Sequence, residues 1–261
     1  MDEITSAKNP KIRQVCTLIE KSRERRALGL FVVEGKREIE HCIKGGFPIE
    51  SLFFCEEIAP FNTISELLSP ETQVFKVSHE AYSKIAYREG TEGVVAIVRE
   101  RERKLEEVVL KEAPFVIVLE SVEKPGNLGA VLRTADACGA AAVVVCDPLT
   151  DLYNPNLIRA SIGGIFTLPV FTCSSEEAFG WLKSNDFQIL TAQLQDSELY
   201  YDVDMKQPTA VVFGTESTGL SDFWRMRSDK KIRIPMLGEL DSLNVSVSVA
   251  ILSYEAVRQK R

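Results

Sequence analysis

The chain has 261 residues, of which 45% are hydrophobic and 26% are charged, and its net charge is −7. This composition is typical of a soluble globular protein and excludes a disordered, collagen-like or membrane-embedded chain. No segment approaches the ~18 consecutive apolar residues of a membrane span, and the first residues lack the apolar core of a signal peptide. We therefore expect a cytoplasmic protein without a membrane partner, built from two domains.

The cysteines and histidines limit the possible chemistry. The six cysteines lie far apart, without the close pairs of a zinc site or redox motif, so we expect reduced thiols and no bound metal. Only His41 and His79 are present, and neither has the sequence context of a catalytic triad. The segment around His79 is typical of a helix start. The sequence therefore favours chemistry that does not use histidine.

The N-terminal region is predicted to begin with an amphipathic helix. Asn9 is a suitable cap, Pro10 suits the first helical position, and Gly29 ends the pattern. One face is apolar and the other is basic. Its basic residues include Lys21, Arg23, Arg25 and Arg26. Charge alone permits a phosphate-contacting surface or a solvated helix face, and it favours the solvated face.

The rest of this region alternates short apolar segments with helical ones, which predicts a small α/β sandwich. Strands are expected at 29–34, 49–55, 72–78 and 93–99, and helices at 36–46, 63–69 and 79–86. A charged stretch from Arg99 to Pro114 cannot enter either core. We place the domain boundary there, giving domains of residues 1–105 and 106–261.

The second domain repeats fully apolar strands of the kind that parallel sheets bury on both faces. They are expected at 115–120, 140–147, 188–194 and 209–216, with helices at 130–139, 174–186 and 244–261. The last helix is ambiguous because NVSVSV alternates like a strand, but its length favours a helix. The sequence thus predicts an α/β domain with a mostly parallel sheet.

Ligands of parallel sheets bind beyond the carboxyl ends of the strands, so the loops at these ends are the candidate sites. Neither the dinucleotide motif G-x-G-x-x-G nor the phosphate loop G-x-x-x-x-G-K-[ST] is present, which argues against NAD and ATP. Taken singly, the residues in these loops also permit structural roles. Ser242 and Asn244 are ordinary helix caps, and Glu216 could cap a helix as well.

Three loop segments together are more specific: NLGAVLRTADACGA, VVFGTESTGLSD and IRIPMLGELDSLNVSVSVA. In this order they closely resemble the signature motifs of SpoU-type RNA ribose 2′-O-methyltransferases of the SPOUT superfamily, over residues 115–261. The first domain resembles the substrate-binding domain of ribosomal RNA members, which is similar to some ribosomal proteins. The resemblance implies a C-terminal knotted parallel-sheet domain, whereas pattern rules alone lead to a Rossmann sheet.

The resemblance also implies a cofactor, S-adenosylmethionine, bound in a bent conformation in a deep cleft, and a homodimer joined through the C-terminal domain. Gly214, Ile234, Leu243 and Val245 would contact the cofactor largely through backbone groups. The segment from Ala192 to Leu194 would close the pocket. The residue after Glu216 is Ser217, where the family usually has glycine.

Arg133 matches the catalytic arginine of the family. Deprotonating an arginine near neutral pH costs about 7 kcal/mol or more, so we expect Arg133 to clamp an RNA phosphate and to stabilise the developing alkoxide. Asn127 and Glu216 are expected to hold Arg133 and the ribose, while Ser242 and Asn244 complete the substrate side.

RNA is the expected partner, and the long N-terminal domain favours ribosomal RNA. Under this interpretation the opening helix contacts RNA through Lys21, Arg23, Arg25 and Arg26. A second basic set in the acidic catalytic half is formed by Arg225, Arg227, Lys230, Lys231 and Arg233. A transfer RNA methyltransferase and a non-catalytic RNA-binding protein remain alternatives. A class I Rossmann methyltransferase is disfavoured because ESVEKPGNLG is not its glycine-rich loop.

Overall fold

The computed structural model describes residues 2–61, 65, 68–87 and 92–261, and it divides into two compact units. The first contains residues 1–102 and 151–167, and the second contains residues 103–150 and 168–261. The predicted boundary puts residues 151–167 in the second domain, whereas in the structure they group with the first unit. Part of the helix expected at 63–69 lies outside the described residues.

The first unit is an α/β sandwich, as predicted. Its described strands form one sheet in the order β1-β4-β3-β5-β2, in which β5 runs antiparallel to β2 and β3. Strand β1 has no counterpart in the sequence prediction. The strands are β1 (Asp2–Ile4), β2 (Leu30–Glu34), β3 (Ile49–Phe54), β4 (Gln73–Val77) and β5 (Val94–Arg99). The helices are α1 (Pro10–Glu20), α2 (Ser22–Leu28), α3 (Lys36–Lys44), α5 (His79–Ile85), α7 (Pro155–Ala160) and α8 (Gly164–Thr167).

The opening helix is split in two, where the sequence predicts one. Lys21 is extended, with φ −114° and ψ 103°, and separates α1 from α2. The break frees carbonyl groups at the end of α1, and such groups need partners. The Arg25 guanidinium donates to the carbonyl oxygens of Leu18 at 2.5 Å and Ile19 at 3.0 Å. An arginine of α2 therefore closes the end of α1.

Residues 151–167 belong to the first unit because their side chains fill its core. Tyr153 stacks on Phe31 with ring centroids 4.2 Å apart, and Phe166 stacks on the same ring at 5.8 Å. The His41 ring lies 3.0 Å from the carbonyl oxygen of Ile162 through Nδ1. These contacts come from side chains whose partners are distant in sequence, so hydrophobic periodicity does not reveal them.

The second unit has a wholly parallel sheet with the strand order β10-β12-β9-β11-β6-β7-β8. The strands are β6 (Phe115–Glu120), β7 (Ala142–Cys146), β8 (Val170–Cys173), β9 (Gln188–Ala192), β10 (Glu198–Leu199), β11 (Thr209–Phe213) and β12 (Lys230–Arg233). The α-helices are α6 (Pro125–Cys138), α9 (Ser175–Ser184), α10 (Asp222–Arg227) and α11 (Val245–Lys260), with single 3-10 turns at Leu105–Glu107 and Tyr200–Asp202.

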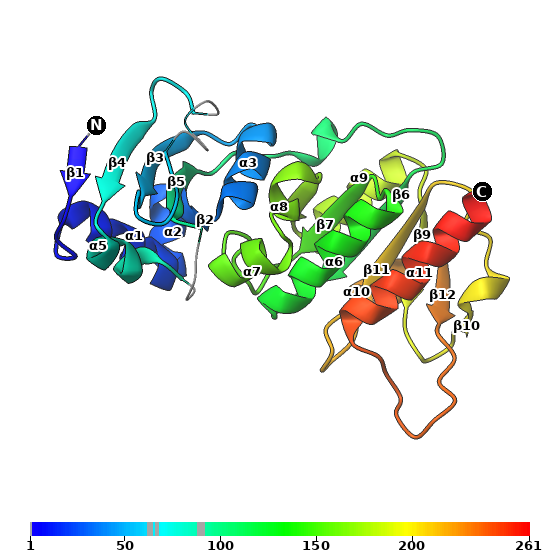
Figure 1. The fold of residues 1–261 in the computed structure, drawn as a ribbon. Helices are drawn as coiled ribbons and strands as arrows, with labels where there is room; N and C mark the ends of the chain where they lie inside the picture. The colour runs from blue at the N-terminus through cyan, green and yellow to red at the C-terminus, as the bar shows by residue number, and fades with distance from the viewer. Residues whose placement is uncertain (1, 62–64, 66–67, 88–91) are drawn as a thin grey trace. The chain divides into compact units, whose positions relative to one another are not determined.

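The position of β11 distinguishes this sheet from a Rossmann sheet. Strand β11 pairs with both β6 and β9, so the later strand lies between two earlier ones. A Rossmann sheet would place β9 directly beside β6. Helix α11 packs against α6, and its first residues lie next to the loop that follows β11. This arrangement brings the three candidate loops to one edge of the sheet (Figure 1).

Two further findings concern expectations from composition. Each of the six cysteines is a free thiol in the structure. In the described part of the chain, no helix is long and apolar enough to cross a membrane.

Candidate active site

A cavity of about 570 Å³ lies at the carboxyl ends of β9, β11 and β12. Parallel strands present their carboxyl ends at one edge, so the loops that leave them converge there. All six residues that sequence analysis assigns to the cofactor line this cavity, as does Ser242. The six are Ala192, Leu194, Gly214, Ile234, Leu243 and Val245.

The loop after β11 is a tight turn that projects Glu216. Thr215 and Gly219 exchange two backbone hydrogen bonds, of 3.2 and 3.1 Å, across the turn. A side chain at Gly214 would collide with the backbone of Gly219, and Gly219 itself has φ +69°. Both positions therefore require glycine. The Thr215 hydroxyl oxygen accepts a 3.0 Å hydrogen bond from the Thr218 amide, which closes the turn further.

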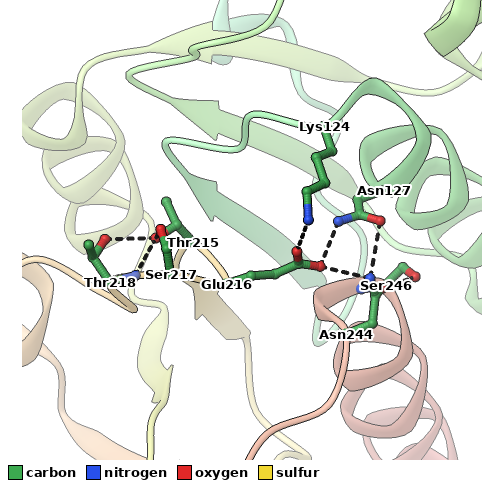
Figure 2. A network of polar contacts seen from close by, with 8 residues as sticks. All are labelled: Lys124, Asn127, Thr215, Glu216, Ser217, Thr218, Asn244 and Ser246. Atoms are coloured by element: carbon green, nitrogen blue, oxygen red, sulfur yellow. Dashed lines mark hydrogen bonds and ion pairs between the residues drawn. The ribbon is translucent and has the colours of Figure 1, made fainter.

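Glu216 is the centre of a polar network that joins three segments (Figure 2). Its Oε1 accepts hydrogen bonds from Nδ2 of Asn127 at 2.8 Å and from Nδ2 of Asn244 at 2.7 Å. Its Oε2 pairs with the Lys124 ammonium. Asn127 lies in the first turn of α6, and Lys124 directly precedes that helix. The three signature segments thus meet at one carboxylate.

Asn244 serves both as a helix cap and as a member of the network. Its Oδ1 accepts hydrogen bonds from the Ser246 amide at 2.9 Å and from the Ser246 hydroxyl at 2.6 Å. Capping of α11 therefore fixes the amide orientation so that Nδ2 faces Glu216. The two functions that sequence analysis treats as alternatives are combined in one residue.

The network keeps Glu216 ionised. A hydrogen bond from the Lys124 ammonium is the largest influence, and it holds the pKa of Glu216 below its ordinary value against a smaller opposing effect of desolvation. The Asn127 amide lowers this pKa further. In turn, Glu216 raises the pKa of Lys124. Glu216 is therefore a stable carboxylate that accepts hydrogen bonds.

Sequence analysis missed Lys124, although a signal was present. A cation beside the N-terminus of a helix opposes the helix dipole, so a lysine directly before Pro125 needs a compensating anion. Glu216 supplies that anion. The unfavourable position of Lys124 could have identified it as a partner of a nearby carboxylate.

The expected contact between Arg133 and the Asn127–Glu216 pair is absent among the described residues. Arg133 is exposed on α6, does not line the cavity, and makes no hydrogen bond or ion pair with any described residue. It follows Asn127 by six residues, which is a rotation of about 240° around the helix, so the two side chains leave different faces. Glu216 instead pairs with the Lys124 ammonium and accepts a hydrogen bond from Asn244.

The predicted RNA-binding set in the first unit is only partly exposed. Lys21, Arg23 and Arg26 are exposed, but Arg25 is buried, with 4% of its side chain exposed, and its Nε lies 2.6 Å from Oδ2 of Asp151. The assignment of Arg25 as a surface contact is therefore wrong for this structure. Its positive charge is needed inside the unit, where it pairs with Asp151 and closes α1.

The cavity has the size and the polar groups that a nucleoside cofactor requires. Ligand pockets generally span about 300 to 1,000 Å³ and combine apolar walls with a few polar groups. Oε1 of Gln193 and Nε of Arg225 are buried without a hydrogen-bond partner among the described residues, and both residues line the cavity. Unpaired buried polar atoms are costly, so they point to a polar ligand. The residues present therefore fit S-adenosylmethionine.

Comparison with known proteins identifies the family. Residues 114–254 match the SpoU rRNA Methylase family, and residues 9–96 match the MRM3-like substrate binding domain. The chain belongs to the SpoU rRNA methylase family.

Individual members of the SpoU family are similar over almost the whole chain. A 23S rRNA (uridine(2479)-2′-O)-methyltransferase of Streptomyces viridochromogenes is 28% identical, over 98% of this chain and 92% of the relative. A 23S rRNA (guanosine(2553)-2′-O)-methyltransferase of Bacillus subtilis is 29% identical, over 97% of this chain and 98% of the relative. The AdoMet-bound rRNA methyltransferase of Sinorhizobium meliloti is 26% identical with a TM-score of 0.90, and the match covers 98% of this chain and 97% of that structure.

These findings confirm the predicted family and α/β fold, the RNA 2′-O-methyltransferase class and S-adenosylmethionine as the cofactor. Pattern rules alone predict a Rossmann sheet and could not supply the position of β11 between β6 and β9.

Proposed function

We propose that this SpoU family chain transfers the methyl group of S-adenosylmethionine to a ribose 2′-hydroxyl of ribosomal RNA. The observation that carries the proposal is the network in which Asn127, Asn244 and Lys124 hold Glu216 beside the 570 Å³ cavity. The names of the two relatives, both acting on 23S rRNA, support ribosomal RNA as the substrate. This substrate would also place the protein in the cytoplasm.

Methyl transfer requires an oriented hydroxyl oxygen and removal of its proton, which in this proposal passes to the RNA phosphate that Arg133 clamps. When bound, the cofactor supplies a methyl group on a positively charged sulfur. Glu216 is ionised and fixed by two amide donors, so it can accept a hydrogen bond from the ribose and orient it. Asn244 and Ser242, at the start of α11, are assigned to the substrate side of the same cavity.

The test uses the purified full chain with S-adenosylmethionine labelled in the methyl group. Ribosomal RNA and transfer RNA are offered separately, and ribose methylation is mapped by resistance to alkaline cleavage. We expect label in ribosomal RNA ribose, and little with Glu216→Gln. Label confined to transfer RNA would show that transfer RNA is the substrate and ribosomal RNA is not. Cofactor binding without transfer to any RNA would favour the non-catalytic alternative.

We further propose a homodimer formed through the second unit, in which a second copy contributes Arg133. This arginine is exposed, lacks an ionic partner among the described residues and does not reach the cavity of its own chain. The adjacent helix α11 exposes apolar side chains, Val247 at 45% and Tyr254 at 51%. A symmetric contact that covers these residues repeats the same patch on both copies and can bring Arg133 of one copy to the cavity of the other.

Mixed dimers test this arrangement. Arg133→Ala and Glu216→Ala chains should each be inactive alone, and co-refolding them in equal amounts should restore about a quarter of wild-type activity, because half of the dimers then hold one intact site. Restoration requires that Arg133 and Glu216 act across the interface. No restoration in proven mixed dimers would contradict a contribution from the second copy.

The first unit is proposed to bind the RNA substrate. The match of residues 9–96 to a substrate-binding domain supports this role, and Lys21, Arg23 and Arg26 provide exposed positive charge. Residues 1–105 and 106–261 are thus proposed as the substrate-binding and catalytic domains, with residues 151–167 packed onto the first.

A further inference from the structure

Helix α10 carries an arginine whose role the proposed reaction does not explain. Arg225 lines the cavity and lies against the turn after β11, with its Nη2 3.3 Å from the position that a Gly219 Cβ would take. It is therefore at the Gly219 end of this turn. Glu216 is at the tip and points to Asn127 and Asn244.

Arg225 extends from a well-anchored helix. The start of α10 is held by Glu120, which accepts hydrogen bonds from the Ser221 amide at 2.8 Å and the Ser221 hydroxyl at 2.5 Å. Trp224 is fully buried, and its Nε1 donates to the Ser175 hydroxyl at 3.1 Å. The base of the Arg225 side chain is thus fixed before any ligand arrives, which lowers the entropic cost of binding.

The guanidinium of Arg225 finds no acceptor among the residues that the structure describes. Its Nε is buried without a hydrogen-bond partner, and none of its nitrogens makes a hydrogen bond or ion pair with a described residue. By contrast, Arg25, Arg99 and Arg258 each pair with a carboxylate. A buried donor without an acceptor is costly, so the half-buried Arg225 needs an acceptor from the cavity side.

The chemistry of the cofactor identifies that acceptor. S-adenosylmethionine carries two positive groups, the sulfonium and the ammonium, and one negative group, the α-carboxylate. A guanidinium repels the first two and matches the planar carboxylate with two parallel hydrogen bonds. We propose that Arg225 binds the α-carboxylate of the cofactor and so positions its amino acid end. The inference rests on the proposed function, in which this cavity holds the cofactor.

The experiment compares ligands with and without the carboxylate, by calorimetry on the full chain without RNA. Arg225→Gln should lower the affinity for S-adenosylmethionine and for S-adenosylhomocysteine about 10- to 100-fold. This is the usual contribution of a hydrogen bond to a charged group. Decarboxylated S-adenosylmethionine should bind Arg225→Gln as well as it binds wild type. Arg225→Lys should be intermediate, because it keeps the charge and loses the planar fork.

Arg227→Gln is the matched control. Arg227 lies on the same helix, is exposed and does not line the cavity, and its guanidinium carbon lies 4.3 Å from the ring centroid of Phe223. Its loss should therefore leave the affinity for each of the three cofactor ligands unchanged. If Arg225→Gln lowered the affinity for the carboxylated and decarboxylated ligands equally, or lowered neither, the inference would be overturned and the proposed function would stand. Failure of wild type to bind any of the ligands would overturn both.

Discussion

Two ion pairs of the molecule have opposite surroundings. In the first unit, the side chains of Arg25 and Asp151 are 4% and 11% exposed. In the second unit, the side chains of Lys124 and Glu216 are 67% and 30% exposed. A buried pair is costly to separate, whereas water and salt weaken an exposed one, so a substrate can rearrange it. We infer that the first pair is structural and that the second is part of the working site.

Arg133 extends this comparison, because it is an exposed cation without an ionic partner among the described residues. If it clamps phosphate in the transition state, Arg133→Lys keeps the charge but loses the planar grip. Methyl transfer should then fall by at least about a hundredfold, and Arg133→Ala should be worse. Single-turnover rates at saturating RNA provide the measurement.

Cofactor affinity of the Arg133 variants should be unchanged, which serves as the control. Saturating RNA should not rescue the rate if the interaction strengthens in the transition state. Full rescue of Arg133→Lys by RNA would limit Arg133 to ground-state binding. A normal rate at every RNA concentration would remove it from the mechanism.

The buried pair is tested through stability. Arg25→Ala leaves Asp151 as a buried charge and exposes the carbonyl groups at the end of α1, so the first unit should lose about 3 kcal/mol of unfolding free energy. Denaturant unfolding measures this loss. Arg23→Ala is the matched control on the same helix and should change stability little. An unfolding free energy that Arg25→Ala leaves unchanged would contradict the structural role of Arg25.

The different burial of these neighbouring arginines marks the limit of sequence reasoning. Local signals were sufficient for the ends of elements: Asn9 caps α1, Asn244 caps α11, and Gly29 ends α2 with φ +61°. The sequence could not assign Arg25 to the interior, because Asp151 is distant in the chain and the break at Lys21 depends on tertiary contacts.

The site was more predictable than the basic helix, because sheet topology constrains it. The resemblance to the SpoU family assigns Gly214, Ile234 and Leu243 to the cofactor, and all three line the cavity at the carboxyl ends of the strands. Helix rotation decided the remainder. Asn127 faces Glu216, but Arg133 leaves a different face of the helix. A linear motif does not specify whether a side chain reaches the site of its own chain or that of a second copy.

The exposed cations of the first unit provide a smaller test. Reversing charge at Arg23 and Arg26 should weaken RNA binding about tenfold at low salt and should flatten its salt dependence, since each lost phosphate contact removes about one unit of slope. Filter binding across a salt series measures both. Cofactor affinity should not change. Unchanged RNA affinity would favour the solvated-face interpretation of this helix.

The smallest expected effect comes from the exposed pair itself. Glu216 has a lowered pKa in the folded protein, so its carboxylate form holds the network above that pKa and is lost as the pH falls through it. Lys124→Met removes the largest cause of the lowering and should shift the acid limb of the rate profile to higher pH. At neutral pH the rate should change by no more than about twofold, because Glu216 stays ionised and exposed pairs contribute little. Lys124→Arg should keep the wild-type profile. An acid limb that is identical in Lys124→Met and wild type would show that the ion pair does not govern the titration of Glu216.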